Sequence, residues 1–86
     1  MNAKSFAIRP LTIRLSRRGD ERSLQRLAAL DSKRPPSGRV LLAEVDRELW
    51  AAVGVDDGRA VADPFRPSGD VVEMLRMRAA MSSRLV

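Results

Sequence analysis

Few side chains in this 86-residue chain are suited to acid–base or metal chemistry. The sequence contains no His, Cys or Tyr. The commonest general base and the commonest nitrogen and sulfur ligands for metals are therefore absent. Asp56 and Asp57 are adjacent carboxylates beside Gly58. This pattern fits a pair of general bases or a metal site, and it also fits a solvated turn. The turn is the favoured interpretation, so the sequence predicts no metal site.

Basic residues are concentrated in the first half of the chain. Residues 1–43 hold ten basic and three acidic side chains, whereas residues 44–86 hold six basic and eight acidic ones. An uneven charge distribution of this kind is typical of a surface that binds nucleic acid or an acidic partner, or of a solvated helix face. The solvated face is favoured because no aromatic residues are interleaved with the arginines. The arginines concerned are Arg14, Arg17, Arg18, Arg22 and Arg26.

Apolar periodicity and chain breakers predict the elements that position these side chains. We expect a flexible N-terminal arm over residues 1–10 and a single domain over residues 11–86. The predicted class is α/β of the α+β type, with a mostly antiparallel sheet of about four strands and two helices, in the order β-α-β-β-β-α. The strands are expected at residues 11–15, 39–46, 49–55 and 59–62, and the helices at 20–31 and 70–82.

The same patterns predict which side chains form the core. On the first helix the apolar stripe comprises Leu24, Leu27, Ala28 and Leu30. Strict alternation along residues 49–55 would separate Leu49, Ala51, Val53 and Val55 from Trp50, Ala52 and Gly54. On the last helix Met74, Met77 and Met81 follow helical spacing, which indicates a core edge or, as the alternative, an adaptable contact surface.

Three short motifs, in this order of elements, resemble the N-terminal half of the GNAT N-acetyltransferase fold. Ile13-Arg14 with Asp20 resembles its first strand and helix start, and Ala43-Glu44-Val45-Asp46 resembles a later strand and turn. Arg66-Pro67-Ser68-Gly69 lies where that family carries its acetyl-CoA loop. The resemblance covers residues 11–82 and implies a truncated domain, because the family continues with further strands and helices.

The resemblance also implies candidate site residues. Backbone N–H groups at a helix start bind phosphate groups, so Arg66, Ser68 and Gly69 are the candidates for contacting acetyl-CoA. Glu44 is the candidate base. Pro67, however, has no N–H group, and Asp70 carries a negative charge where the pyrophosphate would lie. We therefore expect no cofactor, with acetyl-CoA as the ligand if the enzyme alternative holds.

Three functions follow, in order of preference. The first is a non-catalytic domain that forms a homodimer or binds another protein through the strand Arg59–Ala62 and the helix Asp70–Ser82. The second is an acetyl-CoA-dependent N-acyltransferase or acyl-CoA binder completed by a second chain, and the third is nucleic-acid binding. The sequence has no long apolar run or signal peptide, and Arg outnumbers Lys 14 to 2. A cytoplasmic protein from a G+C-rich bacterium is expected, without membrane attachment.

Overall fold

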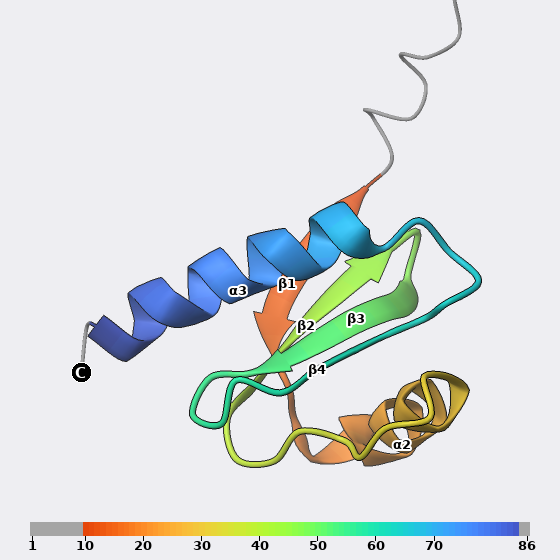
Figure 1. Cartoon of the computed structure of the whole chain (residues 1–86), viewed down its shortest axis with the longest axis horizontal. Coiled ribbons are helices and arrows are strands. Elements are labelled where there is room, and N and C mark those ends of the chain that lie inside the picture. The colour runs from red at the N-terminus through yellow and green to blue at the C-terminus, as the bar shows by residue number, and fades with distance from the viewer. Residues whose placement is uncertain (1–9, 85–86) are drawn as a thin grey trace, which may run out of the picture.

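A four-stranded antiparallel sheet carries one helix on each face in the computed structural model, which describes residues 10–84 (Figure 1). The elements are β1 (Leu11–Leu15), the 3-10 turn η1 (Arg18–Asp20), α2 (Glu21–Leu30), β2 (Val40–Val45), β3 (Glu48–Gly54), β4 (Ala60–Ala62) and α3 (Gly69–Arg84). The predicted α+β class and the order of strands and helices are confirmed. The bounds of the first strand match, and those of the other elements differ by one or two residues. Except for Pro10, the expected N-terminal arm lies outside the described residues.

Each strand lies beside its neighbour in the chain, so the sheet order is β1-β2-β3-β4. β1 pairs with β2 from Leu11 opposite Val45 to Leu15 opposite Leu41. Pro10 continues this ladder, because its carbonyl accepts the Asp46 N–H at 3.1 Å. Among the described residues, β1 and β4 are therefore the two edges of the sheet.

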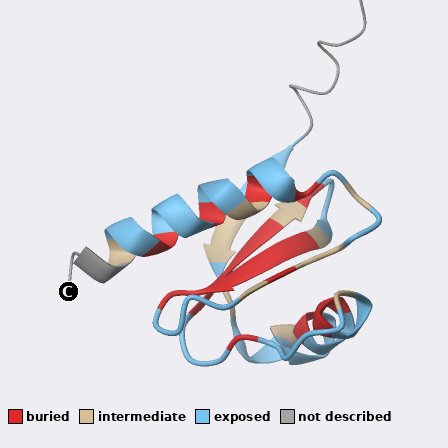
Figure 2. Ribbon diagram, viewed as in Figure 1, coloured by how far each residue is buried: buried red, intermediate tan, exposed pale blue. Residues whose placement is uncertain are grey.

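Both faces of the sheet are covered by apolar side chains, as the buried positions on β2, β3 and the inner sides of the helices show (Figure 2). Strands buried on both faces read as continuous apolar runs, which explains the sequence of β2 and β3. On the α3 side the buried cluster includes Leu41, Ala43, Val45, Trp50, Ala51, Val53, Val71, Leu75 and Ala79. On the α2 side it comprises Leu24, Leu27, Ala28, Val40, Leu42, Ala52 and Val61.

The alternation expected along β3 is wrong at its start. Ala43 lies opposite Ala51 and Glu44 lies opposite Leu49, so Trp50 is an extra residue in β3. This is a β-bulge, which breaks the regular alternation of side chains. As a result Trp50 and Ala51 both belong to the α3-side cluster. Leu49, expected on the same face as Ala51, instead packs on the α2 side.

Two further core assignments are wrong. Leu30 is exposed, because at about 100° per residue it lies at the margin of the sheet-facing stripe formed by Leu24, Leu27 and Ala28. The methionines of α3 are not a core edge but exposed side chains. Met74 is 42% exposed, Met77 66% and Met81 59%. Val71, Leu75 and Ala79 hold the sheet-facing side of α3, which leaves the methionines pointing outward.

The β2–β3 connection is a two-residue hairpin turn with a strained second position. Asp46 has φ 53° and Arg47 has φ 69°. Both values lie in the left-handed region used by the turns that match the twist of β-hairpins. Asp tolerates this region, whereas Arg incurs a steric cost from its Cβ atom.

Replacing Arg47 by glycine should therefore raise the free energy of unfolding by about 1 kcal/mol. For a chain of this size that corresponds to a melting temperature higher by about 4–8 °C, measurable by thermal denaturation. Arg47→Ala is the matched control, since it removes the charge but keeps the Cβ atom. Equal stabilisation by alanine and glycine would contradict the backbone explanation and assign the effect to charge.

Candidate functional site

The candidate acetyl-CoA loop, residues 66–69, lies between β4 and α3. Asp63, just after β4, fixes its conformation through hydrogen bonds. The Asp63 carboxylate accepts the Phe65 N–H at 2.8 Å through Oδ1 and the Arg66 Nε–H at 3.3 Å through Oδ2. The Asp63 carbonyl accepts the Ser68 hydroxyl at 3.0 Å. These bonds, made within six residues of chain, explain why this proline-containing segment adopts one conformation.

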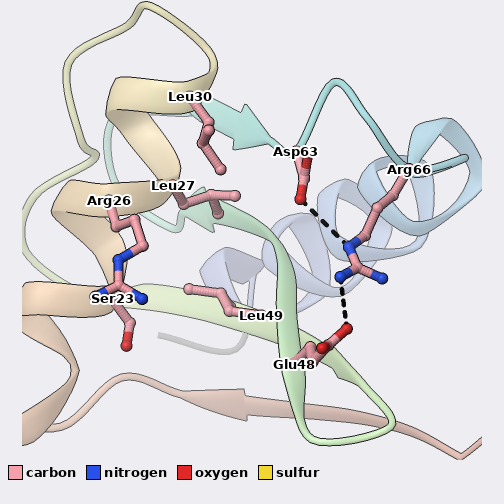
Figure 3. A pocket seen from close by; sticks show the side chains of 8 residues that line it. All are labelled: Ser23, Arg26, Leu27, Leu30, Glu48, Leu49, Asp63 and Arg66. Carbon is pink, nitrogen blue, oxygen red and sulfur yellow. Dashed lines mark hydrogen bonds and ion pairs between the residues drawn. The ribbon is translucent and has the colours of Figure 1, made fainter.

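Arg66 is held by two carboxylates and an aromatic ring. Its guanidinium also contacts Glu48 at the start of β3, where Nη2 lies 2.6 Å from Oε1. The guanidinium carbon lies 5.2 Å from the centre of the Trp50 ring, a cation–π distance. Figure 3 shows the side chain directed toward Asp63 and Glu48. The positive charge of Arg66 is thus balanced by protein carboxylates, which lowers its capacity to attract a phosphate.

Ser68 and Gly69 lie at the start of α3, as the sequence predicts. Ser68 is buried and its carbonyl accepts the Val72 N–H at 3.0 Å, which places it immediately before the helix. Its hydroxyl donates to the carbonyls of Asp63 and Arg66. Asp70 occupies the first turn of the helix. The Ser68 hydroxyl is therefore used by carbonyls of the loop, and Asp70 adds a negative charge at the helix start. Both features oppose anion binding.

The other candidate, Glu44, belongs to a separate cluster of charges. Arg14 on β1 bridges two carboxylates: its Nη2 atom lies 3.1 Å from Oε2 of Glu44, and its Nη1 atom lies 2.9 Å from Oδ2 of Asp20. A second pair of bonds, from Nε to Glu44 and from Nη2 to Asp20, completes the bridge. Such multidentate geometry is characteristic of arginine with carboxylates. Glu44 is thus held by an arginine, which makes it a poor general base.

Asp20 is tied into this cluster by its position in the chain. As the sequence predicts, it stands at the start of the helix: it is the N-cap residue of α2 and also ends the 3-10 turn, and its carboxylate accepts the Arg17 N–H at 2.6 Å. The hydrogen bonds from Arg14, followed by the one from Arg17, lower the pKa of Asp20 to about 2. The same pairing raises the pKa of the Arg14 guanidinium. Asp20 and Arg14 therefore stay ionised near neutral pH, and the cluster connects β1, η1 and β2.

A shallow hollow of about 260 Å³ lies beside Arg66 (Figure 3). α2 forms one wall with Arg26, Leu27 and Leu30, and Arg66 with its two carboxylates forms the other. The remaining lining residues are Ser23 and Leu49. The chain has no histidine to activate Ser23. The charged groups on the Arg66 side already satisfy one another, so the hollow offers an apolar floor rather than a set of reactive groups.

The other candidates are distributed over the surface. Asp56 pairs with Arg39 at 3.0 Å, which lowers the pKa of Asp56. Asp57 instead accepts the Arg59 N–H at 2.9 Å. The two carboxylates thus have different partners, and no group of three or more metal-ligating side chains occurs within residues 10–84. Of the basic residues considered for nucleic-acid binding, Arg14 is paired with Asp20 and Glu44. The other four are exposed: Arg17, Arg18, Arg22 and Arg26.

The acidic partners of Arg66 and Arg14 were not predicted from the sequence. Asp63 precedes Arg66 by three residues, and this spacing next to a turn was an available signal. Glu48 has no such signal, because it reaches Arg66 only through the position of the β2–β3 hairpin. Within residues 10–84 no helix is long and apolar enough to cross a membrane.

Comparisons were made with protein-family models, with curated proteins and with solved structures. None of the three found a match to this chain. The GNAT resemblance therefore stays a prediction.

Proposed function

We propose that this chain acts through protein–protein contacts, chiefly by self-association, rather than by catalysis. The observation that carries the proposal is the exposure of Met74, Met77 and Met81 on one helix. Methionine is flexible and polarisable, and exposed methionines are frequent on surfaces that bind other proteins. A group of large exposed apolar side chains on a small domain is typical of an interaction site.

The position of these methionines on α3 supports the same proposal. Arg76 donates to the Gly58 carbonyl at 3.2 Å, so this flank of α3 faces the β3–β4 connection. With about 100° per residue, Met74 and Met81 lie on the opposite flank, and Met77 points further outward. Because the sheet order is β1-β2-β3-β4, this opposite flank faces the β1 side. The methionines are thus presented above one sheet edge.

The charges at the two candidate enzyme sites favour contact over catalysis. Arg66 is bound by Asp63 and Glu48, and Glu44 is bound by Arg14. A cofactor-binding arginine or a general base would have to break these ion pairs before acting. The acyltransferase alternative therefore has less support than self-association. A cytoplasmic location remains part of the proposal.

Sedimentation equilibrium between about 5 and 500 µM tests the proposal, since a small interface predicts a reversible dimer in this range. The average mass should rise with concentration. The double change Met77→Gln and Met81→Gln should weaken association at least threefold, because it removes apolar contact area while keeping the helix. Phe65→Gln is the matched control: Phe65 is also exposed but lies on the loop before α3. A mass that stays monomeric throughout would reject self-association.

A further inference from the structure

We infer that the outer edge of β1 pairs with the β1 edge of a second copy, antiparallel and across a two-fold axis at Ile13. The inference rests on the proposed self-association and specifies the surface that performs it. It differs from the expectation that the β4 edge, Arg59–Ala62, is the contact.

The β4 edge is short and partly occupied. β4 has three residues, Ala60–Ala62. The Asp63 N–H bonds to Trp50 of β3, so in an antiparallel ladder the neighbouring Ala62 directs its N–H away from β3. That N–H is already bound by Oδ2 of Asp31, at 3.0 Å. A side chain that occupies an edge donor in this way limits pairing with another chain.

The β1 edge is longer and its outward groups follow from the ladder with β2. The Ser16 N–H bonds to the Val40 carbonyl at 2.8 Å, and the Pro10 carbonyl accepts the Asp46 N–H. Backbone groups alternate in direction along an antiparallel strand. The even-numbered residues of β1 therefore face β2. The backbone groups of Leu11, Ile13 and Leu15 face outward.

These three residues are self-complementary about Ile13. In antiparallel pairing with the axis at Ile13, this residue lies opposite the partner's Ile13, and Leu11 lies opposite the partner's Leu15. Each of these is a hydrogen-bonded pair, so the outward N–H and C=O groups of the three residues gain partners. The Leu15 carbonyl already accepts a bond from Nη1 of Arg14 at 3.3 Å, and its second lone pair accepts the bond from the partner strand. Shifting the register by two residues leaves the outward N–H and C=O of one leucine in each copy, Leu11 or Leu15, without partners in the other strand. The two-fold arrangement is also the commonest symmetry of homodimers.

The side chains fit this register. Ile13 packs against the α3-side cluster, so Leu11 and Leu15, at the same parity, lie on that face as well. Leu11 is 38% exposed and Leu15 is 52% exposed. In the dimer each covers the other across the new strand pair, beneath the methionine flank of α3. Cross-strand pairs of large apolar side chains stabilise antiparallel sheets.

The charges on the opposite face are compatible with pairing. Thr12, which is uncharged, lies opposite the partner's Arg14. The two arginines therefore do not face each other, an arrangement that would destabilise the pair. Arg14 itself is neutralised by Asp20 and Glu44. An edge of five residues buries less than the roughly 1,200 Å² of a stable interface, so the dimer should be weak and reversible.

Charge substitution at the two leucines tests the surface. Leu11→Lys combined with Leu15→Lys should raise the dissociation constant at least tenfold, because lysines on an edge strand prevent edge-to-edge pairing. Both positions are exposed, and unchanged circular dichroism would verify that the fold is kept. Leu30→Lys is the matched control, since Leu30 is 44% exposed and lies on α2, away from β1. It should leave association unchanged.

Disulfide cross-linking tests the register. The chain has no cysteine, so Leu11→Cys with Leu15→Cys introduces the only thiols. Opposed residues of a hydrogen-bonded pair lie about 5.5 Å apart at Cα, within the range that a disulfide spans. Mild oxidation should convert the double variant to a reducible covalent dimer. Leu15→Cys alone should cross-link much less, because its opposite residue remains Leu11.

The outcomes separate the two levels of the proposal. A mass independent of concentration in the unsubstituted chain would overturn both self-association and the β1 contact. Association that persists in the double-lysine variant, without cross-linking of the double-cysteine variant, would overturn only the β1 edge and leave self-association through α3. Loss of association in the lysine variant together with cross-linking supports the β1 pair.

Discussion

Replacing Leu75 by alanine should lower the free energy of unfolding by about 3 kcal/mol. Leu75 is fully buried in the middle of α3, against the cluster that includes Leu41 and Val53. The truncation removes apolar contact and leaves a cavity, since surrounding side chains relax only in part. A domain of this length has a total stability of only about 4–13 kcal/mol, so the loss is a large fraction. Urea denaturation followed by the fluorescence of Trp50, the single tryptophan, measures it.

Met77→Ala is the control on the same helix. Met77 is exposed, so its truncation should change the free energy of unfolding by less than about 0.5 kcal/mol. A similar cost for both variants would contradict the orientation of α3 on the sheet. The comparison also separates packing from the proposed contact, because Leu75 holds the helix to the sheet whereas Met77 belongs to the surface proposed for self-association.

Replacing Arg14 by methionine should lower the free energy of unfolding by about 2 kcal/mol at pH 7, because two half-buried carboxylates lose their common donor. The cost should shrink in acid. The pKa of Asp20 is about 2 in the folded chain against an ordinary value of 3.8. A lowered folded pKa contributes stability that is present above pH 3.8 and is lost as the pH falls toward 2. After allowance for solvent screening, this contribution is about 1–2 kcal/mol.

Urea midpoints of the Arg14→Met variant and of the unsubstituted chain, measured from pH 6 to pH 2, test this dependence. The two curves should converge as the pH falls through the range of the Asp20 titration. Arg39→Met is the matched control, because the Arg39–Asp56 pair is exposed to solvent. It should leave the midpoint unchanged at each pH, as is usual for surface ion pairs. A constant difference between the Arg14 curves would show that the loss comes from packing rather than from charge.

Most of the fold was predictable because its signals are local. Period-2 alternation predicted β1, apolar runs between turn residues predicted the strands that follow α2, and Pro35-Pro36 with Gly38 predicted the end of the first helical region. The bulge at Trp50 was not predictable, since an extra residue exists only in relation to the partner strand. The exposure of Leu30 was a local signal that was missed: at about 100° per residue, Leu30 lies at the margin of the stripe formed by Leu24, Leu27 and Ala28.

The candidate site was predicted in position but not in chemistry. The residues Arg66, Ser68 and Gly69 do lie together at the start of α3. Their bonding depends on Glu48 and Asp63, and Glu48 is distant in sequence. The charge state of a site is set by neighbours in space, whereas the sequence pattern reports neighbours along the chain. For the same reason, the pairing of Glu44 with Arg14 across two strands followed only from the register.

The sheet order β1-β2-β3-β4 has a consequence for how the chain forms during its synthesis. Every strand pairs with the strand made immediately before or after it, so no strand has to wait for a distant segment. Ladders of this kind close short loops, which favours rapid folding. As the ribosome releases the chain, β2 meets β1, and then β3 and β4 add in turn to an edge already formed. Of the elements that the structure describes, α3 emerges after the others, so the face that it covers is the last part of this core to be shielded from water.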